Sequence, residues 1–302
     1  MTRRSAGVAL ALVTACISGA SIWVNGHAVS RFADATVYTT AKDAVAGVLL
    51  LVLALSWPAR TARPVERIVG RRRALGLGAV AVVGGSVPFV LFFEGLQRAE
   101  ATQASFIQKT LVVWVALLAV PLLKERVRGP HLLAIALLVV GQAWLAGHAG
   151  RIAFGGGEAM ILAATLLWAV EVVLVKRLVA GIPPRVLAAS RMGLGTALLV
   201  AWVGVTGRLS ALTALDASQW RWIVLTGLLL TGYVATWYAA LARAQAVDVT
   251  AVLVLGAVVT AALSGAFDGA AVNPVGIALV GLGAALAAGL ALRRREAEAG
   301  TT

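Results

Sequence analysis

Charged side chains inside apolar stretches are the first places in this sequence where chemistry could occur. Lys109 lies well inside the apolar stretch 102–122, directly after Gln108. A charge at that depth is costly in lipid, so it normally faces protein, water or a ligand. We predict that Lys109 and Gln108 bind a carboxylate or another anionic group of a small molecule. A structural ion pair, or a side chain that snorkels to the membrane surface, is the alternative.

Two carboxylates are further candidates. Glu171 lies deep in an apolar stretch, where a carboxyl group could take up and release protons. A static ion pair with Lys109 or Lys176 is the alternative. Glu94 lies near the end of the stretch 74–96, where it could contact a bound molecule or simply be solvated.

Three more charges stand nearer the ends of apolar stretches. Lys42 and Asp43 lie close to the start of the stretch 37–56, and Arg191 lies close to the start of another. Side chains at such positions can reach the membrane surface. We interpret Lys42 and Asp43 as snorkelling residues, and Arg191 as a cytoplasmic anchor or the partner of a neighbouring helix.

Aromatic side chains near these charges could form the apolar wall of a ligand site. Trp114 follows Lys109 by five residues, and Tyr233 and Trp237 are spaced to share one helix face. We predict that all three contact a bound molecule. Trp237 could equally belong to the aromatic belt at the membrane surface.

The elements that must position these residues are transmembrane helices. The 302-residue chain is 60% hydrophobic and 13% charged, with a mean hydropathy of +0.92, which a soluble domain could not bury. Each apolar stretch is close to the ~20 residues that cross a bilayer as helix. We therefore predict an all-α integral membrane protein with ten transmembrane helices, at 6–26, 37–56, 74–96, 102–122, 130–148, 157–176, 185–206, 221–242, 248–267 and 274–292.

The charges between the stretches predict the topology. Most of the 26 Lys and Arg residues fall on one side of the membrane if both termini share that side, which the positive-inside rule makes cytoplasmic. The net charge of +13 is thus explained by loops, and we expect no nucleic-acid partner. With one Cys, three His and no phosphate-binding loop, we expect no metal, no cofactor and no enzymatic activity.

The two halves of the sequence repeat one another. Residues 92–101 (FFEGLQRAEA) match 237–246 (WYAALARAQA) at an offset of 145, and residues 134–141 match 276–283 at an offset of 142. Lys42 and Arg191 open comparable stretches at an offset of 149. We predict two five-helix repeats, 1–149 and 150–292, followed by a basic cytoplasmic tail at 293–302. Since five is odd, the second repeat must be inverted.

The block Pro121–Gly141 (PLLKERVRGPHLLAIALLVVG) carries a family resemblance, with Leu123-Lys124-Glu125 where Leu-Gly-Glu is usual. Leu166–Ala169, Asp248–Val259 and Gly276–Gly283 extend it over almost the whole chain. The sequence resembles the ten-helix, EamA-type members of the drug/metabolite transporter superfamily. It departs from their pattern at Phe267-Asp268-Gly269, which replaces Leu-Gly-Glu, and at Ser18-Gly19, where Trp-Gly is common.

The resemblance implies a transporter with a central cavity between its halves. We expect a secondary transporter in the bacterial inner membrane that works by alternating access and exports an amino acid or a related amphipathic metabolite. Lys109 would hold the anionic group, and Glu171 would couple transport to protons. A membrane scaffold or sensor, and a lipid-modifying membrane enzyme, are the alternatives. The Gly-rich tenth helix could also support a homodimer.

Overall fold

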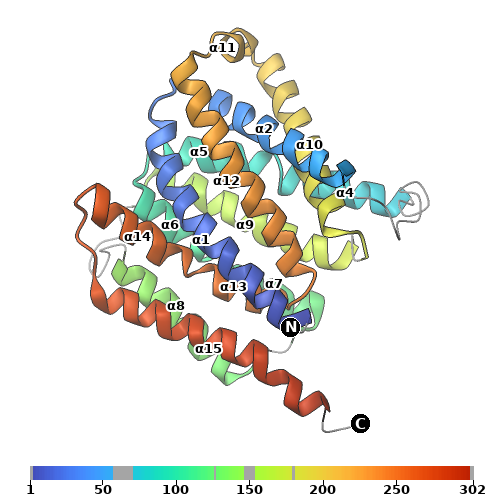
Figure 1. The fold of residues 1–302 in the computed structure, drawn as a ribbon, viewed down its shortest axis with the longest axis vertical. Coiled ribbons are helices and arrows are strands. Elements are labelled where there is room, and N and C mark those ends of the chain that lie inside the picture. The colour runs from blue at the N-terminus through green and yellow to red at the C-terminus, as the bar shows by residue number, and fades with distance from the viewer. Residues whose placement is uncertain (1–2, 57–70, 126, 146–153, 179–180, 300–302) are drawn as a thin grey trace.

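Every element of the described chain is helical (Figure 1). The computed structural model describes residues 3–56, 71–125, 127–145, 154–178 and 181–299. The helices of the first half are α1 (Arg3–Val29), α2 (Ala35–Ser56), α4 (Arg71–Val83), α5 (Val87–Leu96), α6 (Ala101–Lys109), α7 (Leu111–Leu123) and α8 (Gly129–Leu145). Those of the second half are α9 (Gly156–Leu178), α10 (Pro184–Val205), α11 (Leu209–Thr213), α12 (Ala217–Leu241), α13 (Ala246–Leu253), α14 (Gly256–Phe267) and α15 (Pro274–Ala299).

These helices form the predicted membrane spans. In the described part of the chain, nine are long and apolar enough to cross a bilayer, with α4–α5, α6–α7 and α13–α14 each counted as one. The remaining predicted span is α8, which has 17 described residues and rises about 25 Å, slightly less than the thickness of a typical hydrocarbon core. Many large apolar side chains, such as Leu55 and Val205, point out of the bundle, as lipid-facing side chains must. The chain is an all-α, multi-pass membrane protein.

Two spans bend at matching places in the two repeats. The fourth span breaks at Thr110, between α6 and α7, and the ninth breaks at Val254 and Leu255, between α13 and α14. Thr110 and Leu255 are separated by 145 residues, the offset that relates the repeated sequences. The helices that follow also end alike, because Lys124 (φ 55°) and Gly269 (φ 69°), again 145 residues apart, both adopt the left-handed conformation.

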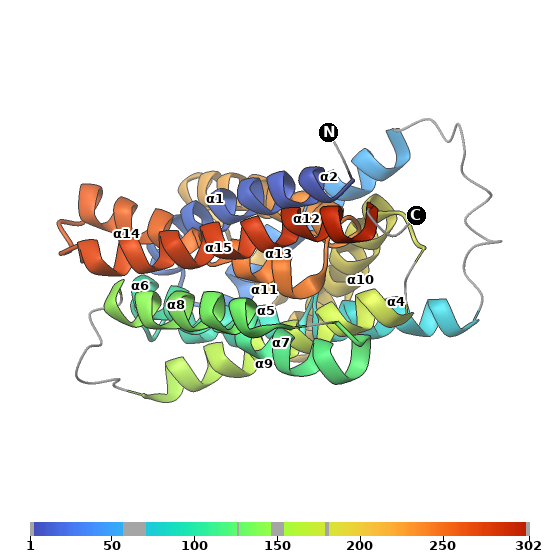
Figure 2. The ribbon, with the colours of Figure 1, turned by 90° about the horizontal axis from the view of Figure 1, so that it is seen from below.

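The last helix of each repeat packs against its counterpart, α8 against α15 (Figures 1 and 2). Small residues allow the close approach, since a Cβ added to Gly141 would lie 2.7 Å from the Val280 nitrogen, and one added to Gly283 would lie 2.8 Å from Leu138 Cγ. At the offset of 142, Leu138 corresponds to Val280 and Gly141 to Gly283, so the two contacts are reciprocal. The pairing runs antiparallel, which fits two inverted repeats.

The first and last helices, α1 and α15, place the described ends of the chain on the same side of the bundle. The first turn of α1 and the last turn of α15 are at the same end of the bundle (Figure 2), as an even number of spans requires. Residues 293–299, predicted as a tail, continue the backbone of α15 as helix. The boundary at 149 and 150, the end of the fifth stretch at 146–148 and the basic segment 57–70 lie outside the described residues.

Candidate functional site

A cavity of about 60 Å³ lies among the spans, and both repeats contribute to its wall. The first repeat supplies side chains from α1, α2 and α5 to α7, and the second supplies side chains from α9, α10 and α12. The lining residues are Ser18, Ser21, Ile22, Asn25, Lys42, Phe89, Phe92, Phe93, Gln108, Leu111, Trp168, Glu171, Val172, Arg191, Leu230, Tyr233 and Trp237. The wall combines charges of both signs with aromatic rings.

One buried ion pair joins α9 to α10 at this wall. Arg191 Nε lies 3.0 Å from Glu171 Oε1, and Arg191 Nη2 donates a hydrogen bond to Oε2 at 3.2 Å. The Tyr238 hydroxyl also donates to Glu171 Oε1. Glu171 and Arg191 are 2% and 3% exposed, so the two charges depend on each other rather than on water. Arg191 is thus the partner of a neighbouring helix, one of its two predicted roles, and not a surface anchor.

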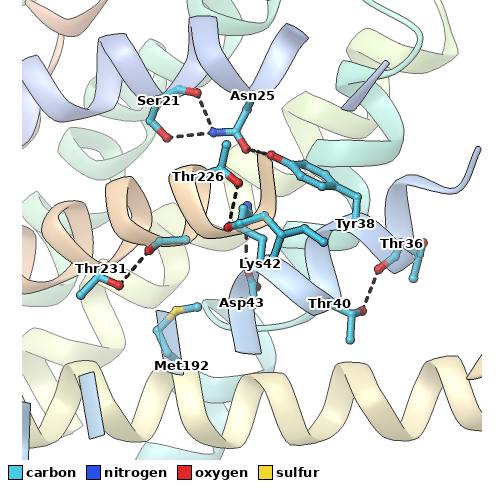
Figure 3. A network of polar contacts seen from close by, with 12 residues as sticks. Ser21, Asn25, Thr36, Tyr38, Thr40, Lys42, Asp43, Met192, Thr226 and Thr231 are labelled. Carbon is cyan, nitrogen blue, oxygen red and sulfur yellow. Dashed lines mark hydrogen bonds and ion pairs between the residues drawn. The ribbon is translucent and has the colours of Figure 1, made fainter. Parts of the chain in front are cut away.

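A second and looser pair lies on α2. Lys42 Nζ is 3.5 Å from Asp43 Oδ1, and both residues are almost fully buried. The interpretation of these residues as snorkelling side chains is therefore wrong, because α2 is covered here by α5, α10 and α12. Figure 3 shows Lys42 beside Tyr38, whose hydroxyl donates a 2.6 Å hydrogen bond to Asn25.

Aromatic side chains from both repeats form a large part of the remaining wall. Phe89 and Phe92 both pack against Trp168, with ring centroids 5.7 and 5.4 Å apart. Tyr233 and Trp237 stack one helical turn apart on α12, with centroids separated by 6.1 Å. Such rings can enclose the apolar part of a small molecule while the charges orient its polar groups.

The break in the third span makes room for the ion pair. Between α4 and α5 the chain turns at Gly84–Ser86, and Pro88 lies in the first turn of α5. A Cβ on Gly84 would come within 2.6 Å of Glu171 Oε2, so the glycine leaves space for the carboxylate. The Gly84 carbonyl, released from the helix, accepts a 3.2 Å hydrogen bond from Trp168 Nε1. The break therefore shapes the cavity and supplies a hydrogen-bond acceptor to its wall.

Lys109 lies one layer behind the cavity rather than on its wall. Its Nζ donates to Ser18 Oγ at 2.7 Å and to Gln108 Oε1 at 2.6 Å, and both acceptors line the cavity. Its side chain passes Gly256, where an added Cβ would lie 3.1 Å from Lys109 Cε. Within the described residues no carboxylate lies within ion-pair distance of Lys109, so the alternative of a structural ion pair with Glu171 is wrong.

The other predicted site residues divide into two groups. Gln108, Tyr233 and Trp237, predicted to contact a bound molecule, line the cavity, and so does Glu171, predicted to couple transport to protons. Glu94 and Trp114 do not line it. Glu94 accepts a hydrogen bond from Thr36 Oγ1 at 3.0 Å and pairs with Arg98, while Trp114 Nε1 donates to Thr110 Oγ1 at 3.1 Å.

The sequence interpretation missed Lys42 and the site role of Arg191. Their shared offset of 149 was the available signal, because residues at matching positions of two inverted repeats can meet at the axis between them. The polar residues Ser18, Ser21 and Asn25 of α1 were also missed. Ser18, Ser21 and Asn25 are spaced at i, i+3 and i+7, which places them on one face of a helix, so their spacing was the signal that could have identified them.

Comparison with known proteins now identifies the family. Residues 5–147 and 155–292 each match the model of the EamA-like transporter family. The chain belongs to this family. The two EamA matches coincide with the two five-helix repeats of the fold, and the family consists of membrane transporters of small solutes.

A solved structure described as "Crystal structure of protein" has the EamA-like fold seen here. The two structures superpose with a TM-score of 0.74 and 19% sequence identity. The superposition covers 96% of this chain and 98% of the other chain. At that identity the likeness shows the fold alone. No curated protein matches the sequence.

Proposed function

We propose that the protein is a secondary transporter that exports a small amphipathic metabolite, such as an apolar amino acid, across the bacterial inner membrane. The observation that carries the proposal is the cavity itself. Charges and aromatic rings from both repeats converge on it, and a buried site at the interface of inverted repeats is the arrangement that alternating access requires. Both termini would lie in the cytoplasm, as the distribution of basic residues predicts.

The predicted residues that line the cavity, and Lys109 behind them, have distinct roles in this proposal. Tyr233 and Trp237 enclose the apolar part of the solute, and Gln108 contacts its polar groups. Lys109 positions Gln108 and Ser18 from behind the wall, since it donates to both. Glu171 exchanges a proton when the carboxylate leaves Arg191 and Tyr238 during the conformational change.

Flux through reconstituted protein tests the proposal. Purified protein in liposomes should exchange labelled L-phenylalanine or L-leucine across the membrane, and Trp237→Ala should reduce that flux at least tenfold. Leu132→Ala, at a side chain that is 60% exposed to lipid, should leave the flux unchanged. If no solute in a broad panel of amino acids, nucleobases and cationic drugs moves under imposed gradients, the transporter proposal fails.

A second measurement isolates proton coupling. Glu171→Gln should abolish flux driven by a pH gradient while leaving solute-for-solute exchange intact, because exchange needs no net proton movement. Flux that remains driven by the pH gradient in this variant would assign the coupling to another group.

A further inference from the structure

The ammonium group of Lys42 lies at the cavity wall, against the aromatic side chains of Phe89 and Phe93. Its Nζ lies 3.5 Å from the centroid of Phe93 and 5.1 Å from that of Phe89. The electron-rich faces of these rings stabilise the ammonium group without using its hydrogen-bond donors in a fixed direction. The group thus remains able to turn those donors towards an anion in the cavity.

The counter-ion of Lys42 is poorly placed to hold it. Asp43 follows Lys42 directly on α2, and neighbouring positions on a helix do not face each other. Both Asp43 carboxylate oxygens lack a hydrogen-bond partner among the described residues, although the side chain is fully buried. The 3.5 Å separation from Lys42 Nζ is longer than a charge-assisted hydrogen bond.

The other two cations near the cavity are occupied. Arg191 is held by two contacts to Glu171. Lys109 donates hydrogen bonds to Ser18 and Gln108 and does not line the cavity. Among the described residues, Lys42 is therefore the cation on the cavity wall that is free to exchange its partner for a ligand.

We propose that Lys42 is the receptor for the carboxylate of the transported solute, and that Asp43 competes with that carboxylate for the same ammonium group. The inference rests on the proposed transport function and specifies its substrate class as small monocarboxylates with an apolar or aromatic body. Phe89 and Phe93, which surround the ammonium group, are the surfaces for that body. When the cavity is empty, Asp43 keeps the charge of Lys42 partly compensated.

The competition predicts opposite effects for the two residues. Dissociation constants would be measured for the purified full chain with L-phenylalanine and with L-phenylalaninamide, which lacks the carboxylate. The unaltered protein should prefer the acid about tenfold or more, as a charge-assisted hydrogen bond provides. Lys42→Gln should remove this preference while retaining the affinity for the amide. Asp43→Asn should strengthen binding of the acid several-fold and leave the amide unchanged.

Lys42→Arg provides the matched control, since it keeps the charge and should keep the preference for the acid even if an uncharged variant folds poorly. Equal discrimination by Lys42→Gln and the unaltered protein would overturn the inference, as would weaker binding of the acid to Asp43→Asn. Absence of binding by the acid would also overturn it. In that case, flux of a solute from another class would leave the transporter proposal standing, whereas absence of all flux would remove both.

Discussion

Lys42 and Arg191 lie over the same aromatic ring. Lys42 Nζ is 5.1 Å and Arg191 Cζ is 5.4 Å from the centroid of Phe89. The two residues occupy matching positions in the repeats, and each has an acidic partner, Asp43 and Glu171. The pseudosymmetric cations thus meet near the axis that relates the two halves, although one is tightly paired and the other loosely paired.

Gly84 should be essential for the packing of the third span. Gly84→Ala would bring a methyl group into the space of the Glu171 carboxylate, and such overpacking costs about 1–3 kcal/mol of unfolding free energy. Denaturation of the purified protein in detergent would measure this loss. Gly78→Ala on α4 is the control, because its added Cβ meets no atom within 4 Å and should not destabilise the protein. Equal losses in both variants would contradict the assignment.

Glu171 and Arg191 should be strongly coupled in stability. Removal of either charge leaves the other buried without its partner, which costs about 3–5 kcal/mol. We expect Glu171→Gln and Arg191→Met each to destabilise the protein by this order, and the double variant to lose much less than the sum. A double-mutant cycle from denaturation curves gives the coupling free energy. Additive losses would show that the pair contributes no specific interaction.

The Lys109 side chain should influence binding indirectly. Lys109→Met retains an unbranched chain but removes the hydrogen bonds to Ser18 and Gln108, each worth about 1.5–3 kcal/mol for a charged donor. We expect the dissociation constant for L-phenylalanine to rise about two- to tenfold, as measured by calorimetry. Gln108→Ala should have a similar effect. Complete loss of binding in Lys109→Met alone would instead indicate that Lys109 contacts the solute directly.

The left-handed residues that end α7 and α14 should respond oppositely to substitution. Lys124 adopts φ 55°, a conformation that costs a residue with a side chain about 1–2 kcal/mol, whereas glycine adopts it freely. Lys124→Gly should therefore raise the unfolding free energy by about 1 kcal/mol, and Gly269→Ala should lower it by a similar amount. Melting curves of the two variants test this pair, and shifts of the same sign would refute it.

The spans could be predicted because lipid requires long apolar helices, and each such helix is continuous in sequence. The repeats were visible for the same reason, since matching apolar stretches keep their order. The break at Thr110 carries no proline or glycine and could not be placed from residue types, and the glycine beside the other break, Gly256, is one of many in these spans.

The pairing of charges could not be predicted, because it depends on how helices pack. The alternative to proton coupling for Glu171 was an ion pair with Lys109 or Lys176, but Lys176 donates to the carbonyl oxygens of Leu241 and Ala244. The real partner, Arg191, comes from the next span. Similarly, the depth of Lys42 depends on the helices that cover α2, which its position in the sequence does not specify.

The reciprocal contact between α8 and α15 has a consequence for the assembly of the two halves. Two surfaces that contact each other in this way resemble the interface of a symmetric homodimer, in which one patch recognises its own copy. The same surface should allow the two halves, expressed as separate polypeptides, to reassemble into one particle.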